Sequence, residues 1–305
     1  MTTRVLPPWW AYASLAASMA LVGCYVGLSK LLVAAFPVFL LAWLRFGIAA
    51  LAMLHWVRRG PGEAPLSRDE RVLMFWESFL GNFLFSIFML FGVALTSAVA
   101  AGVVMAALPA AVALLSRIFL YARINGRVLL AIACAMAGIA LLALQKGEAG
   151  APAASPWGYV LLLGAVLCEA SYVVIGKRLA GRVAPRRISA LINLWGLALV
   201  TPFGLWQALS FDFQAVPVAT WTLLVFYAIA ASVVTVWLWM QGLRHVAAPQ
   251  AGVFTVMLPL AAAAVGIVFL GEPFGPGHTA ALVLALAGLL LATWPARAAT
   301  GAALP

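Results

Sequence analysis

Long apolar stretches, separated by short polar or basic segments, run through the whole chain. A helix that crosses a bilayer takes about 20 mostly apolar residues, so several of these stretches are long enough for two helices. Turn signals such as Pro37, Thr96-Ser97, Gly126 and Pro273 divide them further. The runs without any charged residue cover positions 5–29, 78–116, 149–168, 188–211, 213–243 and 246–271.

This pattern predicts an all-α membrane protein with ten transmembrane helices. The alternative for the first run is a cleaved signal peptide that begins with Arg4. That run is long for a signal peptide and nine similar runs follow it, which favours a membrane helix. The ten helices are placed at 9–29, 38–57, 72–95, 98–120, 126–145, 157–178, 188–209, 219–241, 247–270 and 277–296.

The composition agrees with a membrane protein and excludes several other classes. Hydrophobic residues make up 66% of the chain and charged residues 9%, with a mean hydropathy of +1.10, unlike a soluble or a disordered chain. The three cysteines lie inside apolar runs, which argues against a disulfide scaffold. The net charge of +10 comes from scattered Lys and Arg residues, so no nucleic-acid partner is expected.

The basic residues predict how the helices are oriented, because Lys and Arg concentrate in cytoplasmic loops. If the N-terminus is inside, fifteen of the 18 basic residues fall on the cytoplasmic side. Lys30 and Lys146 then fall outside, and Arg45 lies within a helix. Both termini are therefore expected in the cytoplasm, and residues 297–305 form a short cytoplasmic tail.

An internal repeat relates the two halves of the chain. Shifted by 150 positions, residues 98–142 align with 248–292 without a gap, and 15 of the 45 pairs are identical. The chain is therefore interpreted as two five-helix repeats, at 9–146 and 156–296. Because five is odd, the second repeat crosses the membrane in the opposite sense. Inverted repeats of this kind are typical of secondary transporters.

Several short motifs occur in a characteristic order. Gly23-Cys24-Tyr25-Val26-Gly27-Leu28-Ser29-Lys30 precedes Pro37 and Leu44-Arg45-Phe46, and the second half carries Leu258-Pro259, Gly271-Glu272-Pro273 and Gly288. In this order the chain resembles the EamA-type repeats of the drug/metabolite transporter superfamily over nearly its whole length. The first copy departs from the pattern, with Tyr121-Ala122 where the second has Gly271-Glu272.

Within that superfamily the chain looks most like the bacterial exporters of aromatic amino acids. The resemblance implies a multi-pass inner-membrane carrier that exports small amphipathic metabolites by alternating access through a central cavity. Aromatic and other amino acids are the expected substrates, and drugs, purines or quaternary amines are the alternative. The expected partners are the substrate and the bilayer, with the proton as a candidate coupling ion. No cofactor and no metal are expected.

Glu169 is the first candidate for a substrate or proton site. It stands twelve residues after Trp157, about 18 Å into its predicted helix and near the bilayer midplane. A charge there costs at least about 2.5 kcal/mol on insertion scales, so it normally faces a cavity or a partner. Tyr172 shares its helix face, and Tyr25 is the repeat counterpart of Tyr172. The alternative is a protonated glutamic acid bonded to a neighbouring helix.

Two other charges inside predicted helices are expected to be structural. Arg45 lies eight residues beyond Pro37, where it is expected to snorkel outward or to pair with a carboxylate. Glu77 lies near the cytoplasmic end of its helix, where Arg68 and Arg71 offer surface partners.

Polar and aromatic side chains complete the candidate substrate site. Ser78, Asn82 and Ser86 recur every four residues and form one stripe, which either lines a cavity or bonds neighbouring helices. Trp237 and Trp239 are candidates for stacking on an aromatic substrate, with packing or lipid contact as the alternative.

Two prolines that the repeat pairs, Pro109 and Pro259, are expected to kink or break their helices. In transporters with inverted repeats, matched helix breaks in the two copies lie close to the substrate site. These prolines are therefore predicted to mark the site or its gate.

Two other kinds of membrane protein fit the pattern less well. An enzyme needs a nucleophile with a base, or a metal cluster, whereas His55, His245 and His278 lie on different loops or helix ends. The chain also has no Cys-x-x-Cys, His-Glu-x-x-His or phosphate-binding glycine motif, which argues against an enzyme and against direct use of ATP. A channel would need rings of charge or of carbonyl groups. The inverted repeat favours a carrier.

Overall fold

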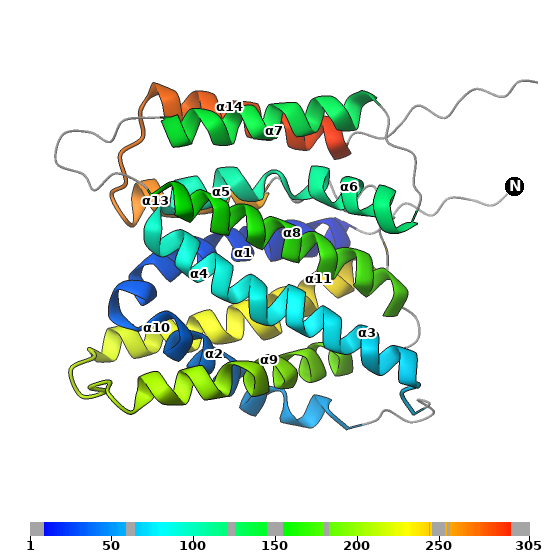
Figure 1. Ribbon diagram of the computed structural model, residues 1–305, viewed down its shortest axis with the longest axis vertical. Coiled ribbons are helices and arrows are strands. Elements are labelled where there is room, and N and C mark those ends of the chain that lie inside the picture. Colours follow the sequence, from blue (N-terminus) through cyan, green and yellow to red (C-terminus); the bar gives the residue numbers. More distant parts are fainter. Residues whose placement is uncertain are drawn as a thin grey trace, which may run out of the picture.

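The computed structural model describes residues 9–58, 65–120, 126–144, 155–179, 183–243, 245, 254 and 257–293. Every secondary-structure element within these ranges is a helix, which confirms the all-α prediction for this part of the chain. The helices run roughly along one common axis, from side to side in Figure 1.

The first half of the chain forms seven α-helical segments. They are α1 (Trp9–Ala35), α2 (Val38–Ala52), α3 (Arg68–Ser78), α4 (Phe85–Leu95), α5 (Ala98–Met105), α6 (Leu108–Leu120) and α7 (Gly126–Leu144). A π-helical segment, Phe79–Leu84, joins α3 to α4 without interruption, and a short 3₁₀ turn, Leu54–Trp56, follows α2.

The second half repeats this arrangement within the described residues. Its helices are α8 (Pro156–Leu179), α9 (Pro185–Ala208), α10 (Val218–Ile229), α11 (Thr235–Leu243), α13 (Met257–Val268) and α14 (Pro276–Thr293). A π-helical segment, Ala230–Val234, joins α10 to α11. Most of the first part of the predicted helix at 247–270 lies outside the described residues.

Five helical stretches are long and apolar enough to cross a membrane: Trp9–Ala35, Arg68–Leu95, Pro156–Gly176, Arg186–Ala208 and Val218–Trp239. Five shorter apolar helices accompany them, at Val38–Ala52, Ala98–Val112, Leu129–Gly138, Met257–Val268 and Pro276–Leu291. These apolar stretches fall on the predicted helices. A helix is the expected form for them, because a backbone in hydrocarbon has to satisfy its hydrogen bonds internally.

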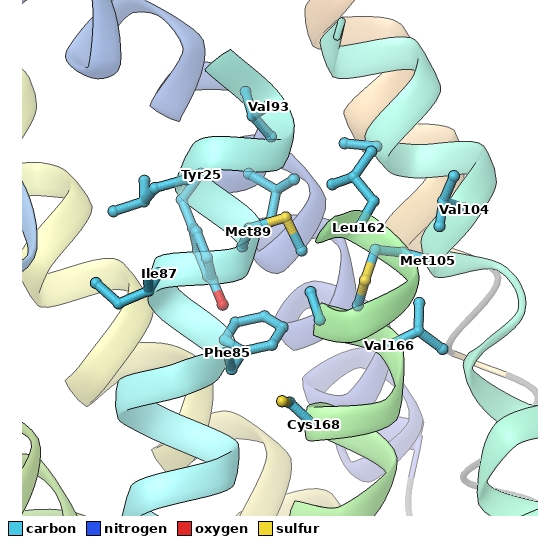
Figure 2. Packing of buried hydrophobic residues seen from close by; sticks show 14 of the residues in the cluster. Tyr25, Phe85, Ile87, Met89, Val93, Val104, Met105, Leu162, Val166 and Cys168 are labelled. Atoms are coloured by element: carbon cyan, nitrogen blue, oxygen red, sulfur yellow. The ribbon is translucent and has the colours of Figure 1, made fainter. Parts of the chain in front are cut away.

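The apolar core joins helices that are distant in the sequence. Figure 2 shows Phe85 and Met89 of α4 beside Met105 of α5 and Leu162 of α8, with Tyr25 of α1 behind them. Leu162 is fully buried and Met89 and Met105 are each 3% exposed. This packing places α1, α4, α5 and α8 around the centre of the molecule.

Glycines let α1 and α13 approach closely. A Cβ added at Gly23 would overlap the Leu258 carbonyl and lie 2.8 Å from Ala261 Cβ. One turn further along α1, a Cβ at Gly27 would lie 2.7 Å from a Val265 methyl group. Small residues of this kind allow the backbones of membrane helices to meet, so this contact depends on the missing side chains.

Two oppositely charged side chains close one end of the bundle, which we call the Lys30 end. The Lys30 ammonium donates to the carbonyls of Val93, Ala94 and Thr96, at 2.7, 3.3 and 2.5 Å, where α4 ends. A cation is favourable there because the last carbonyls of a helix have no partner within the helix. Lys30 therefore does not end α1, which continues to Ala35, beyond the predicted end at residue 29.

Glu272 has the complementary role at the start of α5. Its carboxylate oxygens accept from the N–H groups of Ala98 and Val99, at 2.8 and 2.9 Å. Gly271 immediately before it has a φ of 63°, a left-handed conformation that glycine adopts readily and that turns the chain toward α5. Glu272 thus ties the second half of the chain to the first at this end, where Lys30 joins α1 to the end of α4.

The opposite end of the bundle carries most of the described basic side chains, and we call it the arginine end. It lies on the side where α3 and α9 begin and where α2 ends (Figure 1). Its arginines include Arg58, Arg68, Arg71, Arg186 and Arg187.

We expect Gly23→Ala to lower the free energy of unfolding by about 1–3 kcal/mol, because the added methyl overpacks the α1–α13 contact. Gly47→Ala is the matched control, since no atom lies within 4 Å of a Cβ at Gly47. Removing a helix-interior glycine there should raise stability by about 0.5–1 kcal/mol. Thermal unfolding in detergent micelles measures both, and midpoints that move together would contradict the packing described here.

Candidate substrate-binding site

A cavity of about 180 Å³ lies between the helices, from the middle of the bundle toward the arginine end. Tyr25, at the middle of α1, lines it together with Ser18, two turns closer to that end. Its apolar wall comes from Met19, Val22, Phe85, Met105, Leu108, Ile192, Ala231, Val236 and Leu258. Its polar and aromatic lining comes from Ser18, Tyr25, Arg45, Asn82, Glu169, Tyr172, Ser189, Asn193, Ser232, Thr235 and Trp239.

Arg45 projects from α2 into the lining of this cavity and is only 5% exposed. Its Nη1 donates to Ser86 Oγ at 3.0 Å and to the Tyr227 hydroxyl at 3.5 Å, and its Nη2 donates to Asn82 Oδ1 at 3.3 Å. The guanidinium carbon also lies 4.7 Å from the centre of the Phe46 ring. Arg45 therefore neither snorkels outward nor serves packing alone, because it lines the cavity while bonding its neighbours.

Glu169, on α8, lines the same cavity. Arg45 of α2 lines it as well. The repeat counterpart of Glu169, Val22 on α1, also faces the cavity. One copy thus contributes a carboxylate where the other contributes an apolar wall, and the cavity holds both a positive and a negative pole.

Both predicted tyrosines lie in the cavity wall. The Tyr25 ring packs edge to face against Tyr227, with centroids 5.6 Å apart and ring planes at 78°. Tyr172 lies over Gly81, where a Cβ would overlap the tyrosine ring, at 2.6 Å from its Cδ2. The two tyrosines therefore reach the cavity from different helices, α1 and α8.

The predicted stripe of Ser78, Asn82 and Ser86 divides between two roles. Ser78 is fully buried, and its hydroxyl donates to the Ile192 carbonyl at 2.7 Å, so it bonds α9 and does not line the cavity. Asn82 donates to the same carbonyl at 3.0 Å and also lines the cavity. The Ser86 hydroxyl donates to the Asn82 carbonyl at 2.5 Å and accepts from Arg45.

The π-helical segments flank the cavity at matching positions of the two halves. Gly81 and Asn82 of Phe79–Leu84 line it, as do Ala231 and Ser232 of Ala230–Val234. A shift of 150 positions, the shift that aligns the sequence repeat, carries residue 80 to 230 and residue 84 to 234. Wide π turns of this kind are frequent at functional sites.

Trp237 is not part of the cavity, in contrast to Trp239. Trp239 lines it, whereas Trp237 is 43% exposed on the outer surface of α11. Side chains two residues apart on an α-helix point about 200° apart, so only one of these tryptophans can face inward. Trp237 is therefore corrected from a substrate-site candidate to an outward-facing side chain.

Pro109 lies at a break of its predicted helix. It is the second residue of α6, directly after the interruption at Ala106 and Ala107. Pro259 is the third residue of α13 as the structure describes it, Met257–Val268. Proline is well tolerated in a first turn, where its missing N–H removes no helical hydrogen bond. Neither proline lines the cavity, but the residues before them, Leu108 and Leu258, both do.

Glu77 differs from its predicted surface position. It is only 2% exposed, whereas Arg68 and Arg71 are exposed at the end of α3. Its carboxylate lies against Gly176 of α8, where a Cβ would be 3.0 Å from Glu77 Oε1. The helix turns this side chain inward because Met74 and Ser78, on neighbouring positions, are buried as well.

The sequence singles out Asn193 as a polar candidate within its predicted helix, and it lines the cavity. Ser189 and Ile192 share its helix face and line the cavity too, but were not predicted; the i, i+4 spacing of Ser189 and Asn193 was the available signal. The Asn193 amide donates to the Phe46 carbonyl at 2.9 Å, while its Oδ1 has no hydrogen-bond partner in the described part of the chain. Ser18 donates to the Thr235 carbonyl at 2.9 Å.

The described residues include no group of three or more His, Cys, Asp or Glu side chains placed to hold a metal ion. The cavity instead has a basic and an acidic side chain in its lining, Arg45 and Glu169, with aromatic and aliphatic walls. Such a pocket suits a small organic molecule that carries charge at one end and apolar surface at the other.

The sequence matches the model of the EamA-like transporter family twice, over residues 9–144 and 156–294. It is 33% identical over 287 residues to the uncharacterized transporter YetK of Bacillus subtilis (strain 168), which covers 92% of this chain and 86% of YetK. It is 25% identical over 255 residues to the uncharacterized transporter YyaM of the same organism, covering 83% of each chain.

One solved crystal structure has a similar fold. It superposes on 91% of this chain and 94% of its own chain, with a TM-score of 0.61 at 19% sequence identity. At this identity the likeness describes the arrangement of the helices alone.

We expect Arg45→Met to lower the free energy of unfolding by about 1–3 kcal/mol, because it removes the donor to the buried Ser86 hydroxyl and to the half-buried Asn82 oxygen. Arg71→Met is the control, since Arg71 is exposed and a substitution there should stay within about 0.5 kcal/mol. Thermal unfolding in detergent micelles compares the two. Equal shifts would show that the guanidinium does not hold the helices around the cavity.

Proposed function

Because the chain belongs to the EamA-like transporter family, we propose that this multi-pass membrane transporter exports small amphipathic metabolites, chiefly aromatic and other amino acids. Its location is the bacterial inner membrane, which the bacterial source of the relatives YetK and YyaM supports. Its partners are a small-molecule substrate and membrane lipid.

The observation that carries the proposed substrate is the pair of opposite charges in one cavity. An amino acid has a carboxylate and an ammonium group on one carbon, and Arg45 and Glu169 offer one pole for each. A charge-assisted hydrogen bond is about twice as strong as a neutral one, so the two poles also orient the substrate.

The remainder of the wall favours an apolar side chain on the substrate. Phe85, Met105, Met19 and Trp239 surround the space that the charged residues leave. Aromatic rings prefer edge-to-face or offset contacts with other rings, and thioether sulfurs also pack well against them. Phenylalanine, tyrosine and tryptophan therefore fit this lining better than alanine.

The proposed mechanism is alternating access by two inverted five-helix repeats, at 9–146 and 156–296. The two matches to the family model and the paired π-helical segments support the duplication. The five long apolar helices and the five shorter ones provide the ten proposed crossings. Basic residues concentrate in cytoplasmic loops, so the arginine end faces the cytoplasm, together with both termini.

The proposed coupling ion is the proton, with Glu169 as its binding residue. As a carboxylate Glu169 attracts the substrate ammonium group, and as a protonated acid it loses that attraction. Binding of a proton and binding of the substrate therefore oppose each other at the same side chain. This reciprocity is what a proton antiporter requires.

A second candidate substrate class is the organic cation, such as a quaternary amine or a cationic drug. The observation that favours it is the group of aromatic rings near Glu169, with Tyr25, Tyr172 and Trp239 in the same wall. Aromatic faces attract desolvated cations, and a carboxylate adds to that attraction. Purines would use the same aromatic lining.

We expect purified protein in proteoliposomes to take up labelled phenylalanine saturably, and faster when unlabelled phenylalanine is trapped inside. Tryptophan and tyrosine should compete and alanine should not, whereas competition by a quaternary amine alone would favour the second candidate.

Glu169→Gln should abolish uptake driven by a pH gradient and spare exchange, while Asp69→Asn, an exposed control, should behave as wild type. Loss of neither activity in Glu169→Gln would remove Glu169 from the coupling step.

We expect Trp239→Ala to raise the KM for tryptophan about 3–10-fold, the loss of one aromatic contact of about 0.5–1.5 kcal/mol. Trp237→Ala should leave the KM within about twofold, because Trp237 lies outside the cavity. Initial rates of uptake at varied tryptophan concentration give both values. A larger effect of Trp237 than of Trp239 would contradict the cavity as the binding site.

A further inference from the structure

Two glycines allow α3 and α8 to interlock on the side of the cavity that faces the arginine end. Gly81, in the π-helical segment after α3, receives the Tyr172 side chain of α8. In return, Gly176 of α8 receives the Glu77 side chain of α3, since a Cβ at Gly176 would lie 3.0 Å from Glu77 Oε1. Each helix thus has a glycine opposite the other helix's polar side chain, so Tyr172 and Glu77 lie in the same narrow contact.

Glu169, Tyr172 and Gly176 form one stripe along α8. They are spaced i, i+3 and i+7, which places them on one face of the helix. Seven residues correspond to about 10 Å along the axis, so Glu77, which packs at Gly176, lies about that far from the level of Glu169. The direction is from the cavity toward the arginine end, because α8 ends there.

The Glu77 carboxyl group is enclosed. Its side chain is 98% buried, with 2% exposed, and its Oε2 accepts no hydrogen bond from the described residues. An ionised carboxylate is strongly disfavoured in such a place, whereas the neutral acid is tolerated. The charge at this position therefore depends on proton exchange with its surroundings.

An apolar cluster separates the cavity from the arginine end beside Glu77. It comprises Met74, Leu179, Val183, Ile188 and Ile192, which we call the floor cluster. All five are buried, and Tyr172 packs against them while lining the cavity. Bulk water does not cross such a cluster, so a polar group beside it offers a proton an intermediate position.

The charged and titratable groups around Glu77 come from the helices packed on α3. On α8 these are Glu169 and Tyr172, and Tyr172 interacts electrostatically with both carboxyl groups. In the sequence, Lys177 and Arg178 follow Gly176. On α9, Arg187 is 8% exposed and Arg186 lies over the Trp56 ring at 5.7 Å. The first turns of α3 carry the exposed Arg68, Asp69 and Arg71, together with Glu70.

From this interlocked arrangement we propose that Glu77 is a second proton-binding site, which passes protons between Glu169 in the cavity and the arginine end. In the transfer, the O–H bond of Glu77 breaks and an O–H bond forms at Glu169, so the negative charge moves from Glu169 to Glu77. Tyr172, whose hydroxyl can both donate and accept, lies between Glu169 and Gly176 in the stripe along α8. The proton-binding site stands by itself, and its part in transport rests on the proposed coupling role of Glu169.

The first test needs no substrate. Infrared pH-difference spectra of the purified wild type and of Glu77→Gln are compared between about pH 4 and about pH 9, where protein carboxyl groups titrate. Glu77→Gln should lose part of the carbonyl band of protonated carboxyl groups and shift the titration midpoint of the component that Glu169→Gln removes. Asp69→Asn is the exposed control on α3 and should leave that midpoint unchanged. Identical buried-carboxyl titrations in wild type and Glu77→Gln would overturn the proposal.

The second test separates a proton role from a structural one. Gly176→Ala keeps both carboxyl groups but adds a methyl 3.0 Å from Glu77 Oε1, so it displaces Glu77. In proteoliposomes both Glu77→Gln and Gly176→Ala should slow pH-driven uptake about tenfold while exchange at equal pH stays within about twofold. Equal losses of both activities would overturn the relay and leave Glu77 structural. Absence of any phenylalanine flux in the wild type would instead overturn the proposed substrate, and the infrared spectra would then decide on Glu77.

Discussion

A guanidinium in an apolar interior has to be hydrogen-bonded, and this requirement at Arg45 shapes the centre of the molecule. Arg45 reaches from α2 to Asn82 and Ser86 on the α3–α4 stretch and to Tyr227 on α10. Asn82 in turn binds the Ile192 carbonyl of α9. Asn193, which follows Ile192 on α9, donates back to the Phe46 carbonyl of α2. Four helices are thereby held around one charge, and the cavity is the space that their polar faces enclose.

Three other charged side chains have different roles because their surroundings differ. The Lys30 ammonium reaches the end of α4 and the Glu272 carboxylate reaches the start of α5, where they bind backbone groups that have no partner within the helix. Glu169 lines the cavity, where a bound molecule can reach it. Charged side chains thus hold helix ends together at the Lys30 end, and toward the arginine end they line the cavity.

The helices were predictable because hydrocarbon imposes one simple rule, a long apolar run with its hydrogen bonds satisfied internally. Glu169, Tyr172 and Tyr25 were found by the cost of a buried charge and by the repeat. The rotation of each helix about its axis was not predictable, since packing decides it. For that reason Trp237 turned out to face outward and Glu77 inward. The position of Lys30 did not end α1, because its ammonium group finds carbonyls on α4.

The wide turns beside the cavity have a geometrical consequence. A π turn holds one residue more than an α turn, and successive residues of an α-helix are about 100° apart. Rewinding Phe79–Leu84 into α-helix would therefore rotate all of α4 against α3 by roughly that angle. The same change in Ala230–Val234 would rotate α11 against α10. A local change of winding at either position would therefore replace part of the side chains that face the cavity, without unfolding a single helix.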